Sequence, residues 1–162
     1  MAGFGDAPGV VKVAFVCIFL GFVLNIVGFA MPYWFSNLLG HQGLWQYCFG
    51  DGVGDNCYRH KILTDWFESV RTFEAIGFIA SIVTLVFVIL YVCVSKTSGS
   101  KIVAILSSLL SIGTAGVILL GIFIYLGKMD LDYISWALGL SVAGGILFGL
   151  SGILLIVSIC SK

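Results

Sequence analysis

The residues best suited to chemistry lie in one polar stretch, 34–57, which no lipid bilayer would accept. Of the five cysteines in the chain, only Cys48 and Cys57 lie outside apolar surroundings. Asp-Gly and Gly-Asp pairs between them are turn signals. A hairpin would bring the two thiols together across a strand pair, where they can oxidise to a disulfide. The sequence therefore predicts a Cys48–Cys57 disulfide, which persists only in an oxidising compartment.

The same stretch and its flank offer two weaker metal alternatives. His41 and His60 could join the two cysteines in a zinc set, but the short Cys-x-x-Cys spacing of structural zinc sites is absent. Asp51 and Asp55 could attract calcium, although the segment between them lacks the ligand series of an EF-hand. Both carboxylates suit a turn better, so we expect neither a metal nor a cofactor.

Motifs for catalysis and for nucleic-acid binding are missing from the sequence. The two histidines offer one possible base, and no serine stands in a nucleophile-elbow context. There is no glycine-rich phosphate loop. The net charge is zero, which leaves no electrostatic footprint for nucleic acid. We therefore expect a protein that is not an enzyme and binds no nucleic acid.

The elements that must position the polar stretch are membrane helices. The chain is 60% hydrophobic and only 10% charged, unlike a soluble globular domain. Four continuous apolar runs are long enough to span roughly 30 Å of hydrocarbon, which takes about 20 helical residues. We expect one tetraspan domain over residues 1–162, folded as an all-α transmembrane four-helix bundle. Its helices are predicted at about 10–30, 73–94, 102–126 and 134–160.

The predicted helices leave two loops on one side, at about 31–70 and 127–133, and both termini on the other. Lysines and arginines divide equally between the two sides, so the positive-inside rule does not orient the chain. The predicted disulfide does, because it requires an oxidising compartment. We expect extracellular loops, cytosolic N- and C-termini and a location in the plasma membrane.

Three polar residues in the apolar runs call for partners. Asn25 is deep enough in the first helix to favour an interhelical hydrogen bond. Arg71 and Glu74 are three residues apart, so they could form an ion pair on one helix face. Because both lie near the membrane edge, this pairing is favoured over a proton or ion pathway.

Small residues and thiols in the helices suggest packing and modification. Gly145 and Gly149 form a GxxxG pattern, which permits close approach of helices in lipid. Packing within the bundle is favoured, with an oligomer contact as the alternative. Cys93 and Cys160 lie at the predicted ends of the second and fourth helices, where cysteines beside the membrane are candidates for palmitoylation.

The first loop resembles the signature of the claudin superfamily, a pattern of the form W…GLW…C…C…R. The superfamily includes claudins, the myelin and epithelial membrane proteins, lens fibre membrane proteins and channel gamma subunits. The resemblance extends over the whole chain through the helix lengths, the short turn between the middle helices and the aromatic entry to the last helix. The residues that carry the signature are Trp34, Gly43, Leu44, Trp45, Cys48, Cys57 and Arg71.

The resemblance implies a fold and roles for the signature residues. A small antiparallel sheet, stapled by the disulfide, would stand on the four-helix bundle. Trp34 and Trp45 would anchor this sheet to the membrane, and Trp66 and Trp136 also fall on the loop side as interfacial anchors. Arg71 would contact the loop or its tryptophan.

The resemblance also implies a function at the cell surface. We expect a claudin-like structural membrane protein of cell–cell junctions, giving adhesion or a paracellular barrier through its first loop. Its partners would be the bilayer and other copies or claudin-like proteins, in the same membrane or on the opposing cell. The segment from Trp34 to Gly43 and the second loop are shorter than in typical claudins. The alternative is therefore an auxiliary, gamma-like subunit of an ion channel or receptor.

Overall fold

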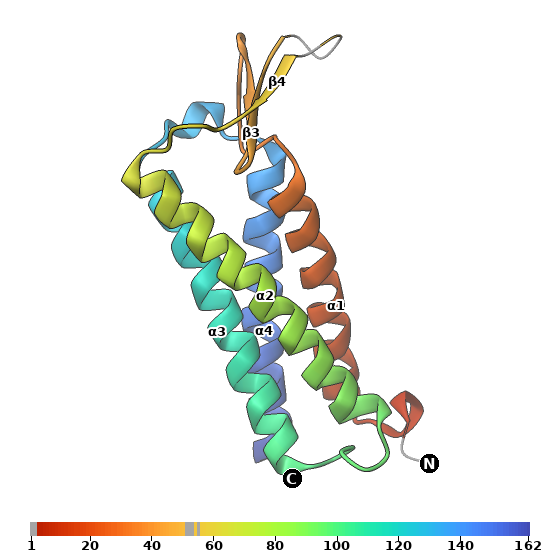
Figure 1. Cartoon of the computed structure of the whole chain (residues 1–162). Helices are drawn as coiled ribbons and strands as arrows, with labels where there is room; N and C mark the ends of the chain where they lie inside the picture. The colour runs from red at the N-terminus through yellow and green to blue at the C-terminus, as the bar shows by residue number, and fades with distance from the viewer. Residues whose placement is uncertain (1–2, 51–53, 55) are drawn as a thin grey trace.

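Four long helices form the body of the molecule in the computed structural model, which describes residues 3–50, 54 and 56–162. All four are long and apolar enough to cross a membrane, so the chain is a multi-pass membrane protein with the predicted four-helix bundle. Both termini lie at the end of the bundle opposite the sheet (Figure 1). The helices are α1 (Gly9–Ala30), α2 (Asp65–Cys93), α3 (Lys101–Leu126) and α4 (Trp136–Cys160).

Helix α2 begins well before the apolar run that marks it in the sequence. Asp65 and Glu68 occupy its first turn, where acidic side chains interact favourably with the helix dipole. Phe67 and Val70 in the same segment are buried. Favourable charge at the N-terminus and burial of these two side chains explain why the helix extends beyond the part that lipid alone would require.

A small antiparallel sheet stands on one end of the bundle, as predicted (Figure 1). Cys48 and Cys57 face each other in register and form the predicted disulfide, with 4.1 Å between their Cα atoms. Asp51 and Asp55, the residues of the calcium alternative, lie outside the described residues. The strands, in their spatial order, are β1 (Phe35–Asn37), β2 (Gly40–Gln42), β3 (Gln46–Phe49) and β4 (Asn56–Arg59).

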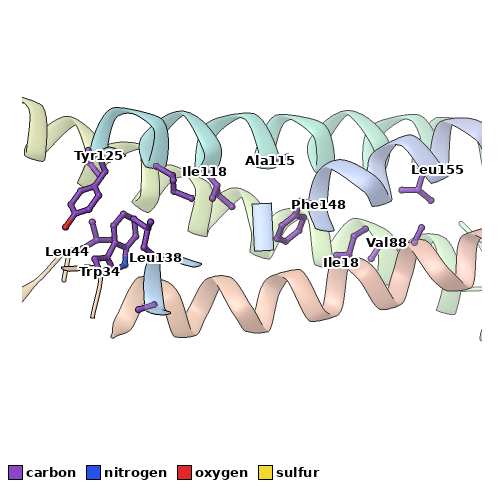
Figure 2. Packing of buried hydrophobic residues seen from close by; sticks show 14 of the residues in the cluster. Ile18, Trp34, Leu44, Val88, Ala115, Ile118, Tyr125, Leu138, Phe148 and Leu155 are labelled. Carbon is purple, nitrogen blue, oxygen red and sulfur yellow. The ribbon is translucent and has the colours of Figure 1, made fainter. Parts of the chain in front are cut away.

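Small residues set the spacing of the helices. A Cβ atom on Gly144 of α4 would lie 2.9 Å from the carbonyl oxygen of Gly21 on α1, so the two backbones are nearly in contact. Gly145 faces Leu119 of α3, and Gly149 faces Ala115. The GxxxG pattern therefore packs against α3 inside the bundle, where side chains such as those in Figure 2 fill the remaining space.

Hydroxyl groups cross-link the helices within the apolar interior. The Ser111 hydroxyl donates to the carbonyl oxygen of Phe148 at 2.6 Å and lies 2.7 Å from the hydroxyl of Ser151. Thr84 of α2 and Thr114 of α3 share a hydrogen bond of 3.0 Å. Such bonds contribute about 0.6 kcal/mol each on average in membrane bundles, so they orient the helices more than they stabilise them.

The interhelical hydrogen bond predicted for Asn25 is not formed. Its side-chain amide is fully buried, but neither of its polar atoms has a partner among the described residues. The reason is its neighbour: α4 presents Gly144 at this position, and a glycine has no side chain to bond. Because the backbones of α1 and α4 approach so closely at this glycine, α4 has no side chain there with which Asn25 could pair.

The contact between Gly21 and Gly144 predicts which glycine can be replaced. Gly144→Ala should lower the free energy of unfolding by about 1–3 kcal/mol, because a methyl group there has no space. Gly139→Ala is the matched control on the same helix, since nothing lies within 4 Å of its Cβ position. Thermal unfolding of the purified proteins in detergent measures both, and equal midpoints for the two variants would contradict the predicted packing.

Candidate functional site at the junction of sheet and bundle

The last turn of α1 leaves backbone carbonyl groups that the helix itself cannot satisfy. Two tryptophans satisfy two of them. The indole N–H of Trp34 donates to the carbonyl oxygen of Gly28 at 2.7 Å, and that of Trp45 donates to the carbonyl oxygen of Phe29 at 2.9 Å. The first loop is thus bonded through side chains to the end of a membrane-spanning helix.

Trp34 is a buried core residue and not the interfacial anchor that the resemblance implied. Its side chain is fully buried, and its ring packs edge-on against Tyr125 of α3 with 5.1 Å between the centroids. Figure 2 shows Trp34, Tyr125, Leu44 and Leu138 together at the sheet end of the core. Because the hydrogen bond to Gly28 satisfies the indole N–H, the whole ring of Trp34 can be buried away from the interface.

The other tryptophans retain surface exposure. Trp45 is 39% exposed and packs edge-on against Phe29, with 5.1 Å between the ring centroids. Trp136 at the start of α4 is 51% exposed and stacks on Tyr33. Trp66 in the first turn of α2 is half-buried. These exposures suit residues at a membrane–water interface, the role predicted for Trp45, Trp66 and Trp136.

The Gly43-Leu44 pair carries the chain through a tight point of the loop. A Cβ atom on Gly43 would lie 2.6 Å from the Met31 carbonyl oxygen and 2.6 Å from Pro32 Cα, so only glycine fits. The backbone N–H of Gly43 donates to the Gln46 carbonyl oxygen at 2.9 Å. Leu44 is fully buried in the core. The loop therefore places one apolar side chain beneath the sheet and turns at once into β3.

Arg71 connects α2 to this turn, as the resemblance implied. Its Nε–H donates to the carbonyl oxygen of Leu44. The guanidinium carbon lies 5.0 Å from the centroid of the Trp45 ring and 5.6 Å from that of Phe67. These contacts combine a hydrogen bond from a charged donor with cation–π attraction. We call Trp34, Leu44, Trp45 and Arg71 the loop clamp.

The predicted ion pair between Arg71 and Glu74 is wrong. Arg71 points to the loop, whereas Glu74 is fully buried against α3, with its Oε1 atom 3.0 Å from the Cβ position of Gly121. Neither oxygen of Glu74 has a hydrogen-bond partner among the described residues. Side chains three residues apart on a helix are rotated by about 300° about its axis. Here this rotation directs Arg71 to the loop and Glu74 into the bundle interior.

Each of the two histidines makes a hydrogen bond to a backbone carbonyl group. They do not form a shared metal site with cysteine thiolates. His41 donates from Nδ1 to the Pro32 carbonyl oxygen at 2.8 Å and stacks on Tyr33. His60 donates from Nε2 to the Gly43 carbonyl oxygen at 3.2 Å. Because the two cysteines are bonded to each other, the zinc alternative loses its thiolate ligands.

The sheet has one covered edge and one open edge. Phe35 in β1 forms a bridge with Ile134 in the second loop, so β1 is covered. All four residues of β4 are exposed. At the β1–β2 turn, Asn37 Oδ1 accepts hydrogen bonds from the N–H groups of Leu39 and Gly40, at 2.9 and 3.1 Å. This turn holds Leu38 and Leu39, which we call the apolar tip.

Sequence reasoning did not find the apolar tip or the role of Tyr125. The spacing of Asn37 and Gly40 around two leucines is a turn signal that could have located the tip. Nothing in the sequence distinguishes Tyr125 from other aromatic residues at helix ends, because its role depends on packing against Trp34. Cys93 and Cys160 are exposed at the ends of α2 and α4, and their palmitoylation stays a prediction.

Fold and site together define a class: a tetraspan membrane protein whose four-helix bundle carries a disulfide-stapled antiparallel sheet. No protein-family model matches the chain, and no curated protein matches it. The resemblance to the claudin superfamily therefore rests on the signature residues of the sequence alone.

The loop clamp predicts the effect of changing Arg71 to lysine. Arg71→Lys keeps the charge but removes the Nε–H donor and the planar group over Trp45. The free energy of unfolding should fall by about 1–2 kcal/mol. Thermal unfolding in detergent measures the loss, and Arg59→Lys on exposed β4 is the matched control, expected within about 0.5 kcal/mol of the parent. The same loss at both positions would contradict the clamp.

His60 predicts a pH dependence of stability. Burial lowers its pKa below the ordinary value of 6.5, the hydrogen bond to the Gly43 carbonyl opposes this, and the charge of Arg71 adds to it. The unfolded chain therefore takes up the proton first as the pH falls, so stability is full above pH 6.5 and declines below it. His60→Gln, which does not titrate, should lose less of its unfolding midpoint than the parent between about pH 7.5 and 5. An identical decline in both would exclude His60 as the cause.

Proposed function

We propose that the chain is a claudin-like structural protein of cell–cell contacts, which acts through its stapled sheet. In this proposal the chain lies in the plasma membrane with the sheet outside and both termini in the cytosol. The disulfide supports this orientation, because Cys48 and Cys57 stay oxidised only in the secretory lumen or outside the cell.

The observation that carries the proposal is an exposed apolar tip on a sheet that is bonded to the bundle. Leu38 is fully exposed and Leu39 is 75% exposed, and the neighbouring Phe49 is also exposed. Clustered apolar side chains in water mark surfaces that bind other proteins. Among the described residues β4 is the last strand of the sheet, and such an edge strand pairs readily with another chain.

The loop clamp makes this surface suitable for bearing a load between membranes. Arg71 and the two tryptophans bond the sheet directly to α1 and α2. A partner that held the sheet would therefore pull on the spanning helices and not on a flexible tether. Such coupling suits adhesion or a barrier between cells, with a second copy or a claudin-like protein as the partner.

The test is enrichment of tagged protein at cell contacts. In cells without junctions, the protein should concentrate where two expressing cells meet and not where an expressing cell meets a non-expressing one. The double variant Leu38→Ser, Leu39→Ser should lose this enrichment, because it removes the apolar tip. Leu131→Ser, at a leucine outside the sheet that is 69% exposed, is the control and should keep it.

Two outcomes would contradict the proposal. One is a uniform distribution of the parent protein together with co-purification of a large channel or receptor. That result would support the auxiliary-subunit alternative, in which the sheet grips a partner in its own membrane. The other is equal enrichment of the tip variant and the parent, which would remove the tip from the contact.

A further inference from the structure

A hollow of about 390 Å³ opens where the sheet meets the bundle, on the side of the loop clamp that faces outward. Its lining comes from three places: the start of β3, the end of β4 and the second turn of α2. We call it the junction hollow. It is lined by Trp45, Gln46, Arg59, His60 and Arg71.

The junction hollow carries two positive charges, and no carboxylate is among its lining residues. In the described part of the chain, no acid lies within ion-pair distance of Arg59 or Arg71, as defined by 4.0 Å between nitrogen and oxygen. The carboxylate that acts on Arg71 is that of Glu68, which is exposed one turn earlier on α2. The charge of the hollow is therefore available to an anion from outside the protein.

The hollow retains hydrogen-bond donors that suit a phosphate group. A guanidinium has five N–H groups, and the bond from Arg71 to the Leu44 carbonyl uses one of them. Gln46 stands opposite Arg59 in the strand register and adds an amide. Arginine forks match the geometry of phosphate oxygens in two parallel hydrogen bonds. Burial lowers the pKa of His60, so at neutral pH the imidazole adds no third charge.

The hollow lies beside the end of the spanning helix α1, where lipid headgroups are expected. Trp45 is bonded to the Phe29 carbonyl, next to the last residue of α1. Below Arg71, Ile82 follows at a spacing of eleven residues and so lies on the same face of α2. Phe78, at a spacing of seven, stacks on Phe29 of α1. Ile82 and the nearby Ile79 are 40% and 61% exposed, so they form an exposed apolar strip on α2 below the hollow.

We propose that the junction hollow binds the phosphodiester of a membrane phospholipid, with an acyl chain lying along the strip of Ile79 and Ile82. Arg59 and Arg71 would hold the phosphate oxygens, and the Trp45 ring would contact the glycerol region. This inference concerns a lipid of the leaflet at the sheet end and does not depend on the proposed role at cell contacts.

Native mass spectrometry of the full chain in detergent tests the site with three probes. Phosphatidylcholine has both phosphodiester and chains, diacylglycerol lacks the phosphate, and glycerophosphocholine lacks the chains. Phosphatidylcholine should bind, and the other two should bind at least about tenfold more weakly. Equal binding of diacylglycerol would overturn the phosphate contact. Equal binding of glycerophosphocholine would overturn the acyl contact and indicate a site for free phosphate esters.

The matched variants locate the lipid on the molecule. Arg59→Gln should weaken phosphatidylcholine binding about tenfold, since it removes a charged donor. Lys61→Gln, two residues further along and outside the lining, should leave it unchanged. Arg59 is exposed and outside the loop clamp, and retention of the Cys48–Cys57 disulfide verifies that the variant is folded. Equal affinities of the Arg59 and Lys61 variants would overturn the proposal.

Discussion

The exposed carbonyl groups at the end of α1 are the constraint on which the sheet end of this molecule depends. A spanning helix must end with carbonyls that have no partner in the helix, and an unsatisfied group near lipid costs free energy. Here the indole groups of Trp34 and Trp45 supply partners for Gly28 and Phe29. The same two bonds hold the first loop on the bundle, so the helix end and the sheet stabilise each other.

The sheet could not keep its shape without this support. Its strands have three or four residues each, and short isolated hairpins are marginal in water. The disulfide fixes β3 to β4, while Arg71 and the two tryptophans bond the first loop to α1 and α2. With this attachment, the apolar tip and the residues of β4 stay exposed. The apolar tip and part of the lining of the junction hollow thus belong to one supported sheet.

In the interior of the bundle, close packing of the helices leaves some polar groups without hydrogen-bond partners among the described residues. Glycines bring α1 and α4 into backbone contact, which leaves the amide of Asn25 without a side chain to bond. Serines and threonines on α3 find partners because α2 and α4 present hydroxyl or carbonyl groups there. Glu74 is buried against a glycine in the same way as Asn25. Close packing of the backbones therefore decides which polar groups are satisfied.

The sequence by itself determined the four spans, the hairpin and the disulfide, because each follows from local patterns of hydrophobicity, turn residues and cysteine spacing. The resemblance to the claudin signature also grouped Gly43, Leu44 and Arg71 as parts of one motif. Only the tertiary structure decided that Trp34 is buried, that Arg71 bonds Leu44 and not Glu74, and that Arg59 and Arg71 share a hollow. These outcomes depend on which helix faces meet and on the rotation of each side chain about its helix, and neither is encoded in local spacing.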